Sequence, residues 1–289
     1  MSWRISVEQH LSEKLKRSVE IKRTVPVSGG SINDAYKIDT DAGLFFVKKN
    51  SASLYPGMFE KEATGLKILA AADAVSVPEV VSWGQKDDTS FLILNYIKSA
   101  SKRPDFWKQF AEGLASLHRN KADYFGLDQD NYIGSLHQSN KKHDNWPDFF
   151  REERLEKQVK AARDRGKIGT DMVRAFDRFY VKLPELFPEE PPSLIHGDLW
   201  GGNFMVDEKG KPVIIDPAIY YGHREMDLGM SQLFGGFDNR FYEAYQRYYP
   251  LEKSWQQRVD YCNLYPLMVH VNLFGGGYIG SVQAILQKF

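Results

Sequence analysis

The sequence has very little cysteine and no excess of charge, and both features narrow the classes of protein to which it can belong. Cys262 is the only cysteine, so an intramolecular disulfide is impossible and a cysteine-based zinc site is excluded. The 38 basic and 38 acidic residues cancel, which gives no electrostatic support for a nucleic-acid or anionic-membrane partner. We therefore expect a reducing, cytoplasmic location, no nucleic acid and no membrane partner, while oligomeric state has no signal in the chain.

Long uninterrupted hydrophobic runs are also absent. The first 18 residues lack the apolar core of a secretory signal and are typical of an amphipathic surface helix. Between Asp260 and Lys288 no acidic residue, lysine or arginine occurs, but proline, histidine, asparagine and three consecutive glycines interrupt the stretch. This pattern predicts buried helices, not a membrane span.

The pattern of strands and helices predicts an α+β protein with two lobes. Between residues 20 and 97 one helix, at 58–72, interrupts five strand-like runs, which lie at 20–27, 34–39, 44–50, 79–85 and 90–97. After residue 97 helical periodicity dominates, at 104–119, 146–166 and 170–183. We expect a small antiparallel β-sheet lobe with one key helix at residues 1–97, and a larger, mainly helical lobe at residues 98–289.

A cluster of polar side chains surrounds one predicted hairpin in the second half, "LIHGDLWGGNFMVDEKGKPVIIDPA". Asp198 and Asn203 lie five residues apart before the first strand, and Asp216 ends the return strand. Oxygen ligands of this kind suit Mg²⁺, which completes its coordination shell with water and nucleotide phosphates. The order resembles the protein-kinase pattern, but His-Gly-Asp replaces His-Arg-Asp and Asp-Pro-Ala replaces Asp-Phe-Gly. These departures favour a small-molecule kinase of the protein-kinase-like fold.

The first lobe should then supply the phosphate-binding half of the site. Gly29 and Gly30, between the first two strands, permit close backbone approach to phosphate oxygens, although a plain hairpin turn would look the same. The next strand offers Lys48 or Lys49, and strand periodicity does not choose between them. The following helix offers Glu60 or Glu62 as the ion-pair partner, and the last strand ends in a possible nucleotide-binding hinge at Leu94, Asn95 and Tyr96.

Taken together, "FFVKKN", "HGDLWGGN", "IDPAIYYGHREMDLGM" and "LFGGGYIGSVQAIL" resemble the fructosamine kinase family, also called ketosamine 3-kinases. The resemblance runs from the glycine turn to the last helix. The motifs "HGD" and "IDP" alone are shared with aminoglycoside phosphotransferases and choline kinases. Trp200 and "GHREMDL" are the features that favour the fructosamine kinase family among these relatives. An aminoglycoside or choline-type kinase is the alternative enzyme, and a catalytically silent nucleotide-binding protein is the alternative outside enzymes.

The resemblance implies roles for individual residues. It implies Asp198 as the catalytic base, Asn203 and Asp216 as Mg²⁺ ligands, Lys48 as the phosphate lysine and Glu62 as its helix partner. The family commonly has an acidic residue before the hinge aromatic, where this chain has Asn95.

Four further residues are expected around this centre. Asp227 and His196 are expected to brace the catalytic loop, although Asp227 is also explained as a helix N-terminal acid. Trp200 either stacks on a sugar or packs under the loop, and Glu225 either lines the substrate pocket beside Arg224 or forms a surface ion pair.

His137 and His143 lack metal-ligand spacing, so no metal is expected there.

The reaction that the resemblance implies is transfer of the ATP γ-phosphoryl group to the 3-hydroxyl of a ketosamine. The acceptor is a fructosamine, ribulosamine or erythrulosamine adduct of a small amine or of a protein. Phosphorylation at that position makes the adduct unstable, so that the amine is released and the glycation is repaired.

Overall fold

A computed structural model describes residues 2–28 and 32–289, so the predicted phosphate turn at Gly29 and Gly30 lies outside the described residues. The chain forms two compact units. Unit 1 comprises residues 1–106 and 205–216, and unit 2 comprises residues 107–204 and 217–289.

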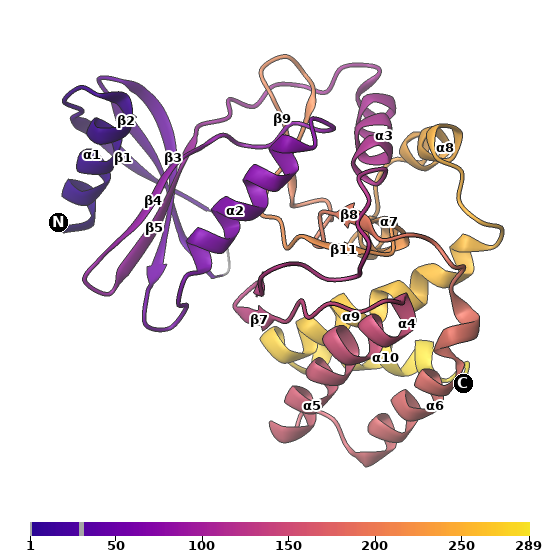
Figure 1. The fold of residues 1–289 in the computed structure, drawn as a ribbon. Helices are drawn as coiled ribbons and strands as arrows, with labels where there is room; N and C mark the ends of the chain where they lie inside the picture. Colours follow the sequence, from indigo (N-terminus) through magenta and orange to yellow (C-terminus); the bar gives the residue numbers. More distant parts are fainter. Residues whose placement is uncertain (1, 29–31) are drawn as a thin grey trace. The chain divides into compact units, whose positions relative to one another are not determined.

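The core of unit 1 is an antiparallel sheet of five strands in the order β1-β2-β3-β5-β4 (Figure 1). The strands are β1 (Ile21–Val27), β2 (Asp34–Thr40), β3 (Gly43–Ser51), β4 (Val80–Lys86) and β5 (Thr89–Asn95). Two-residue turns join β2 to β3 and β4 to β5 at the positions that the sequence predicts, and Asp87 adopts φ 53° in the second turn. All five strands predicted from the sequence are present.

Two helices cover the two faces of this sheet, α1 (Ser2–Leu15) and α2 (Met58–Ala71). Because successive side chains of β3 point to opposite faces, Phe45 packs with α1 and Phe46 packs with α2. The sequence predicts α1 as an amphipathic surface helix, and the structure adds that Val7 and Leu11 on its inner side are completely buried. The first lobe thus has a second helix that forms one wall of its core.

A hairpin from the middle of the sequence also belongs to unit 1. It consists of β9 (Phe204–Val206) and β10 (Pro212–Ile214), joined by a turn in which Gly210 N–H donates to Asp207 C=O at 2.9 Å. The Ile214 N–H donates to Ser76 C=O at 2.9 Å, and the Ala100 N–H donates to Val206 C=O at 3.3 Å. These bonds attach the hairpin to the segments after α2 and after β5.

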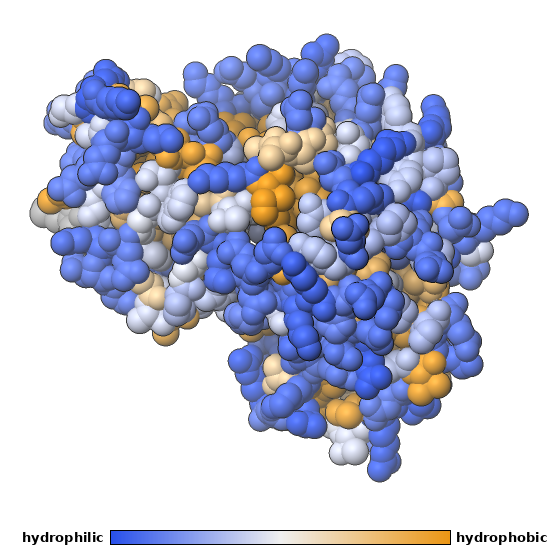
Figure 2. Space-filling view, in the orientation of Figure 1, coloured by the Kyte–Doolittle hydropathy of each residue, from blue (hydrophilic) through white to orange (hydrophobic). Residues whose placement is uncertain are grey.

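Unit 2 is mainly helical, and its long helix α9 packs against α7, α5 and α10. Its helices are α3 (Phe106–Leu117), α4 (Trp146–Phe149), α5 (Glu156–Asp164), α6 (Thr170–Leu186), α7 (Glu225–Leu233), α8 (Asn239–Tyr248), α9 (Trp255–Phe274) and α10 (Ile279–Leu286). The side of α5 and α6 seen in Figure 2 carries mostly hydrophilic residues, as expected for helices that bury one face. Within the described ranges, no helix has both the length and the apolar character needed to cross a membrane.

Two local features of unit 2 differ from the sequence prediction. The predicted helix at 146–166 contains a π-helical turn, Phe150–Leu155, between α4 and α5. Two short antiparallel pairs lie outside the predicted strands: β6 (Asn131–Ile133) pairs with β7 (Leu136–Gln138), and β8 (Ser193–Ile195) pairs with β11 (Tyr220–Gly222). Strands of three residues are too short for alternation to be recognised in a sequence.

Candidate functional site

The first group of candidate residues lies in unit 1 and is centred on Lys48. Its ammonium Nζ lies 2.7 Å from Glu62 Oε1 and 2.7 Å from Asp216 Oδ1. The Lys48 and Glu62 side chains are buried, whereas the Asp216 side chain is 45% exposed. Burial opposes the charge of Lys48, but the two carboxylates outweigh it and raise the lysine pKa, so the ammonium stays protonated.

The structure also shows why Lys48 and not Lys49 occupies this position. Lys48 points to the face of β3 that α2 covers, where Glu62 is its neighbour. Lys49 points to the opposite face and pairs with the exposed carboxylate of Asp34 at 2.6 Å. Strand periodicity leaves this choice open, because it predicts that the two lysines point to opposite faces of the sheet but not which face α2 covers.

The backbone of Asp216 is left-handed. Its φ is 56°, in a region that few non-glycine residues other than asparagine and aspartate adopt. This residue follows β10 closely, so the hairpin delivers its carboxylate to Lys48.

The predicted hinge lies where β5 ends. Leu94 is buried, Asn95 is exposed and Tyr96 is half-buried. The Asn95 N–H donates to Glu79 C=O at 3.0 Å and the Tyr96 N–H donates to Leu44 C=O at 3.3 Å. A base recognised at this strand end would therefore have to use backbone groups other than these two N–H donors.

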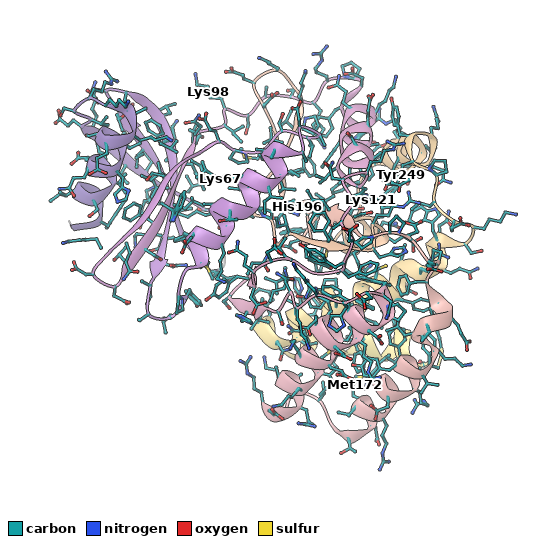
Figure 3. All side chains as sticks on the ribbon, viewed as in Figure 1. Lys67, Lys98, Lys121, Met172, His196 and Tyr249 are labelled. Carbon is teal, nitrogen blue, oxygen red and sulfur yellow. The ribbon has the colours of Figure 1, made fainter. Side chains whose placement is uncertain are left out.

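The second group of candidate residues lies in unit 2 and is centred on Asp198. Asn203 Nδ2 donates to both the Asp198 carbonyl oxygen and its carboxylate Oδ2, each at 2.8 Å. These bonds use the nitrogen of the Asn203 amide and leave its oxygen as the atom suited to a cation. The Asp198 N–H donates to Nδ1 of His196, which is completely buried in the interior of unit 2 (Figure 3).

The loop that carries Asp198 is held from behind by Asp227 at the first turn of α7. The carboxylate of Asp227 accepts the His196 N–H at 2.7 Å and the Gly197 N–H at 2.9 Å. Burial disfavours the charge on Asp227, yet the hydrogen bond from His118 and the contacts with His196 lower its pKa below the ordinary aspartate value. The carboxylate therefore stays ionised as a rigid acceptor for the loop.

Sequence reasoning missed the residues that orient Asp227. His118 Nε2 lies 3.2 Å from Asp227 Oδ2, and His118 Nδ1 lies 2.7 Å from the Tyr245 hydroxyl. Because a carboxylate can only accept, Nε2 carries the proton and the tyrosine donates to Nδ1. His118 follows the apolar stripe of α3 as a lone histidine, which is no signal of such a role.

The turn between His196 and Asp198 requires glycine. Gly197 has φ 82°, and a Cβ at this position would collide with the Ala218 carbonyl oxygen. The Ala218 N–H in turn donates to His196 C=O at 2.9 Å. The segment that follows Asp216 therefore packs directly against the turn that presents Asp198.

A small pocket opens beside Asp198 within unit 2. Its lining consists of Ile133, Gly197, Asp198, Met226, Met230, Tyr265, Pro266, Val269 and His270. His270 Nδ1 lies 2.7 Å from Pro266 C=O, so Nδ1 carries the proton and Nε2 is the acceptor in the neutral ring. The enclosed space is about 10 Å³, which is about the size of one water molecule, so the pocket can admit a single hydroxyl group between one carboxylate and one imidazole but not a whole acceptor.

Sequence reasoning missed these pocket residues too. Met226 and Met230 are four residues apart on α7 and share a face, which is a helical signal but equally typical of a core. Trp200, which was expected near the substrate, packs over Gly202 and against Phe234, with ring centroids 5.7 Å apart. It does not line this pocket, so a sugar-stacking role stays a prediction.

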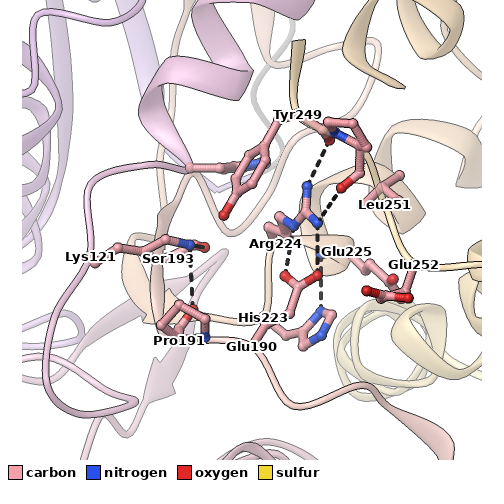
Figure 4. Close-up of polar contacts among 12 residues, drawn as sticks. Lys121, Glu190, Pro191, Ser193, His223, Arg224, Glu225, Tyr249, Leu251 and Glu252 are labelled. Atoms are coloured by element: carbon pink, nitrogen blue, oxygen red, sulfur yellow. Dashed lines mark hydrogen bonds and ion pairs between the residues drawn. The ribbon is translucent and has the colours of Figure 1, made fainter. Parts of the chain in front are cut away.

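The structure corrects the predicted role of Glu225. It is 2% exposed, and both of its carboxylate oxygens accept from Arg258, at 2.6 and 2.7 Å. Arg224 binds Glu190 in the same two-pronged way and also donates to Tyr249 C=O (Figure 4). These are internal ion pairs at the start of α7, so the two residues neither line the pocket nor form surface pairs. The sequence could not predict this, because their partners come from distant segments that no local pattern reveals.

His143, Glu152 and Glu153 have potential ligand atoms within 4.8 Å of one another. His143 Nε2 lies 3.3 Å from Glu153 Oε1, and Lys157 Nζ lies 3.3 Å from Glu153 Oε2. The lysine already supplies the positive charge that a cation would bring. We interpret the cluster as an ion-pair network.

Because the protein contains buried histidines, we expect its free energy of unfolding to fall in mild acid. Burial lowers the pKa of both His118 and His223 below the ordinary value of 6.5. Below that value the unfolded chain binds protons that the folded chain does not, so each histidine should reduce the free energy of unfolding by at most about 1.4 kcal/mol per pH unit. Denaturant titrations between about pH 7.5 and 5.5 test this. A free energy of unfolding that stays constant over this pH range in the wild type would contradict the prediction.

Relatives of this chain were found over almost its whole length. The family model of fructosamine kinase matches residues 3–289. A probable ketoamine kinase of Enterococcus faecium is 38% identical over 269 residues, which cover 92% of this chain and 95% of that protein. A chloroplastic protein-ribulosamine 3-kinase of Arabidopsis thaliana is 37% identical, with coverage of 94% and 84%.

Solved structures agree with these relatives. A putative fructosamine-3-kinase from Haemophilus somnus superposes with a TM-score of 0.88 at 30% identity, covering 98% of this chain and 96% of that one. An aminoglycoside phosphotransferase has a TM-score of 0.66 at 16% identity, covering 98% of each chain, and shares the fold alone. The predicted α+β, protein-kinase-like fold is thus confirmed, and this chain belongs to the fructosamine kinase family.

Proposed function

We propose that this protein is an ATP-dependent ketosamine 3-kinase, which transfers the γ-phosphoryl group of ATP to the 3-hydroxyl of a sugar-derived ketosamine. The observation that supports the proposal is that each unit holds a preformed group of charged and polar side chains of the kind that phosphoryl transfer uses. Unit 1 presents Lys48 between Glu62 and Asp216, and unit 2 presents Asp198 fixed by Asn203. Family membership supports the reaction class, and the related chains are named as ketoamine and ribulosamine kinases.

The proposed chemistry asks for positioning and charge, because phosphoryl transfer needs little covalent chemistry from the protein. Asp198 orients the acceptor hydroxyl and accepts its proton as the oxygen attacks the γ-phosphorus, while the bond from that phosphorus to the β–γ bridging oxygen breaks and ADP leaves. The permanent charge of Lys48 neutralises phosphate oxygens, and Glu62 holds the lysine in place. Asp227 and His196 hold the backbone of the catalytic loop, so that Asp198 is oriented before substrate binds.

The donors that flank the β9–β10 hairpin fit Mg²⁺. Asn203 directly precedes β9 and Asp216 follows β10, and both side chains offer oxygen atoms, which hard divalent cations prefer. We assign these two residues as the Mg²⁺ ligands. When bound, the ion would neutralise charge on the nucleotide phosphates.

The acceptor would enter beside Asp198. The pocket there has room for one hydroxyl group, which would lie among Met226, Met230 and Val269 and could donate to His270 Nε2, while the rest of the sugar adduct would extend out of the pocket. Phosphorylation at the 3-position then makes the adduct unstable and frees the amine. We assign the acceptor to the class of fructosamines, ribulosamines or erythrulosamines, on small amines or on proteins.

A substrate panel tests the proposal. Purified protein with Mg-ATP should form ADP with a fructosamine or a ribulosamine, and not with an aminoglycoside or choline. Phosphate transferred to the sugar should be identified at the 3-position by NMR, with the Asp198→Asn variant as the background. Turnover of only the aminoglycoside or choline would reject the ketosamine assignment and favour the alternative kinase. ATP binding without turnover of any acceptor would favour a silent nucleotide-binding protein.

A cytoplasmic location remains a prediction of ours. It rests on the single cysteine, Cys262, which is buried and forms no disulfide.

A further inference from the structure

A cluster of buried amides lies behind the pocket that contains Asp198. Gln138 and Asn140 are each 1% exposed, and Asn131 is 7% exposed. They belong to or follow the β6–β7 hairpin, which the sequence does not distinguish from a surface loop. Amides so completely buried are costly unless their donors and acceptors are used, so the partners of each atom carry information.

Gln138 uses both ends of its amide. Its Nε2 donates to Ala218 C=O at 3.0 Å and to Asn131 Oδ1 at 2.8 Å. Its Oε1 accepts from the Tyr265 hydroxyl at 2.7 Å. Asn131 Nδ2 adds a bond to Ile219 C=O at 2.8 Å, so two neighbouring carbonyls are held by two neighbouring amides.

The partners of Gln138 are parts of the catalytic arrangement. Ala218 donates its N–H to His196 C=O, and the Ala218 carbonyl lies so close to Gly197 that a Cβ there would not fit. Tyr265 lines the same pocket as Asp198. A single side chain therefore connects one wall of the pocket with the backbone against which the Gly197–Asp198 turn rests.

The far end of the cluster is anchored by a buried cation. Arg154 is completely buried, and its guanidinium donates to Asn140 Oδ1 at 2.7 Å while it lies 3.8 Å from the centre of the Tyr220 ring. Asn140 Nδ2 donates in turn to Asn131 Oδ1 at 3.0 Å. Each amide in this series is oriented by the next, which gives the cluster one arrangement of donors and acceptors.

We propose that Gln138 is a positioning residue for Asp198: by fixing the Ala218 carbonyl and the Tyr265 hydroxyl, it holds the Gly197–Asp198 turn in the geometry that phosphoryl transfer needs. Of the two measurements that test this proposal, hydrogen–deuterium exchange is independent of the proposed function and only the kinetic measurement rests on it. A displacement of about 1 Å in such a turn is enough to cost about 10²-fold in rate, although Gln138 itself touches no reacting atom.

The first measurement is independent of activity. Gln138→Met keeps the length of the side chain and removes both amide groups, so hydrogen–deuterium exchange should become faster in peptides from 194–204 and 216–222. The matched control is Gln158→Met, because Gln158 is 6% exposed in the same unit but its Oε1 accepts from Asn272 Nδ2. Unchanged exchange in Gln138→Met at those peptides, or the same increase in Gln158→Met, would overturn the proposal.

The second measurement asks whether the turn matters for the reaction. Gln138→Met should lower kcat for the ketosamine by about 10- to 100-fold and leave Kd for ATP unchanged, whereas Gln158→Met should lower Tm alone. Tyr265→Phe removes only the hydroxyl that binds Gln138, and it provides a mild variant if Gln138→Met does not fold; its kcat should fall in the same direction. Faster exchange with an unchanged kcat would overturn the link to catalysis. A wild type without ketosamine turnover would instead refute the proposed function, and the exchange result would still decide the positioning of the turn.

Discussion

Replacing Asp198 with alanine is expected to lower kcat for phosphoryl transfer by about 10²–10⁴-fold, the usual contribution of a positioned general base. Kd for ATP should stay close to that of the wild type, because the proposed phosphate lysine and its partners belong to unit 1. Steady-state kinetics with a ketosamine and calorimetric titration with ATP measure the two quantities separately.

Two further variants separate loss of the base from damage to the loop. Asp198→Asn keeps an oxygen that can accept from Asn203 Nδ2, so the loop should stay intact while the capacity to take a proton is lost. Asp177→Ala, an exposed position on α6, should leave kcat unchanged. Wild-type turnover in Asp198→Ala would reject the assignment of the base.

Replacing Lys48 with methionine should have the second large effect, of about 10²–10³-fold on kcat, since a charge placed to neutralise the transferring phosphate is lost. The variant should also lose stability, by about 3–5 kcal/mol, because Glu62 would remain buried without its cation. The double variant Lys48→Met with Glu62→Gln should recover much of that stability but none of the activity. This combination distinguishes the electrostatic role from simple unfolding.

The neighbouring lysine provides the matched control. Lys49 lies next to Lys48 on the same strand, but its partner Asp34 is 65% exposed, so Lys49→Met should change stability by no more than about 1 kcal/mol. Its kcat should be that of the wild type. Equal losses of activity in the two variants would refute the assignment of Lys48 as the phosphate lysine.

The elements with regular periodicity could be predicted from the sequence, and those held by long-range contacts could not. The five strands of unit 1 and the long helices of unit 2 have alternating or helical patterns over seven or more residues. The β6–β7 hairpin has three-residue strands and is held by bonds from Asn131 and Gln138 to the carbonyls of Ile219 and Ala218, which lie 80 or more residues away. Hydrogen bonds of that kind leave no local pattern.

The candidate site divides in the same way. Asp198, Asn203 and Asp216 could be proposed because one hairpin places them at fixed spacing, whereas the strand pattern offered Lys48 and Lys49 equally and only the family resemblance selected Lys48. Glu225 was misplaced because an acid beside an arginine has the same local pattern whether it faces a pocket or binds Arg258 in the interior. The pocket residues of α9 were missed since apolar side chains on a buried helix have no distinguishing pattern.

The segment 205–216 belongs to unit 1 although it is distant from the rest of that unit in the sequence, and this has a consequence for how the protein can be divided. Residues 1–106 contain Lys48 and Glu62, but the carboxylate that completes this group, Asp216, is encoded more than a hundred residues later. A fragment cut after residue 106 would hold the lysine with one acid partner and would lack the β10 strand that binds beside Ser76. Unit 1, which we propose to hold the nucleotide, is thus not a separable module of residues 1–106, and exchange of the N-terminal segment alone would separate Lys48 from the Asp216 of its own chain.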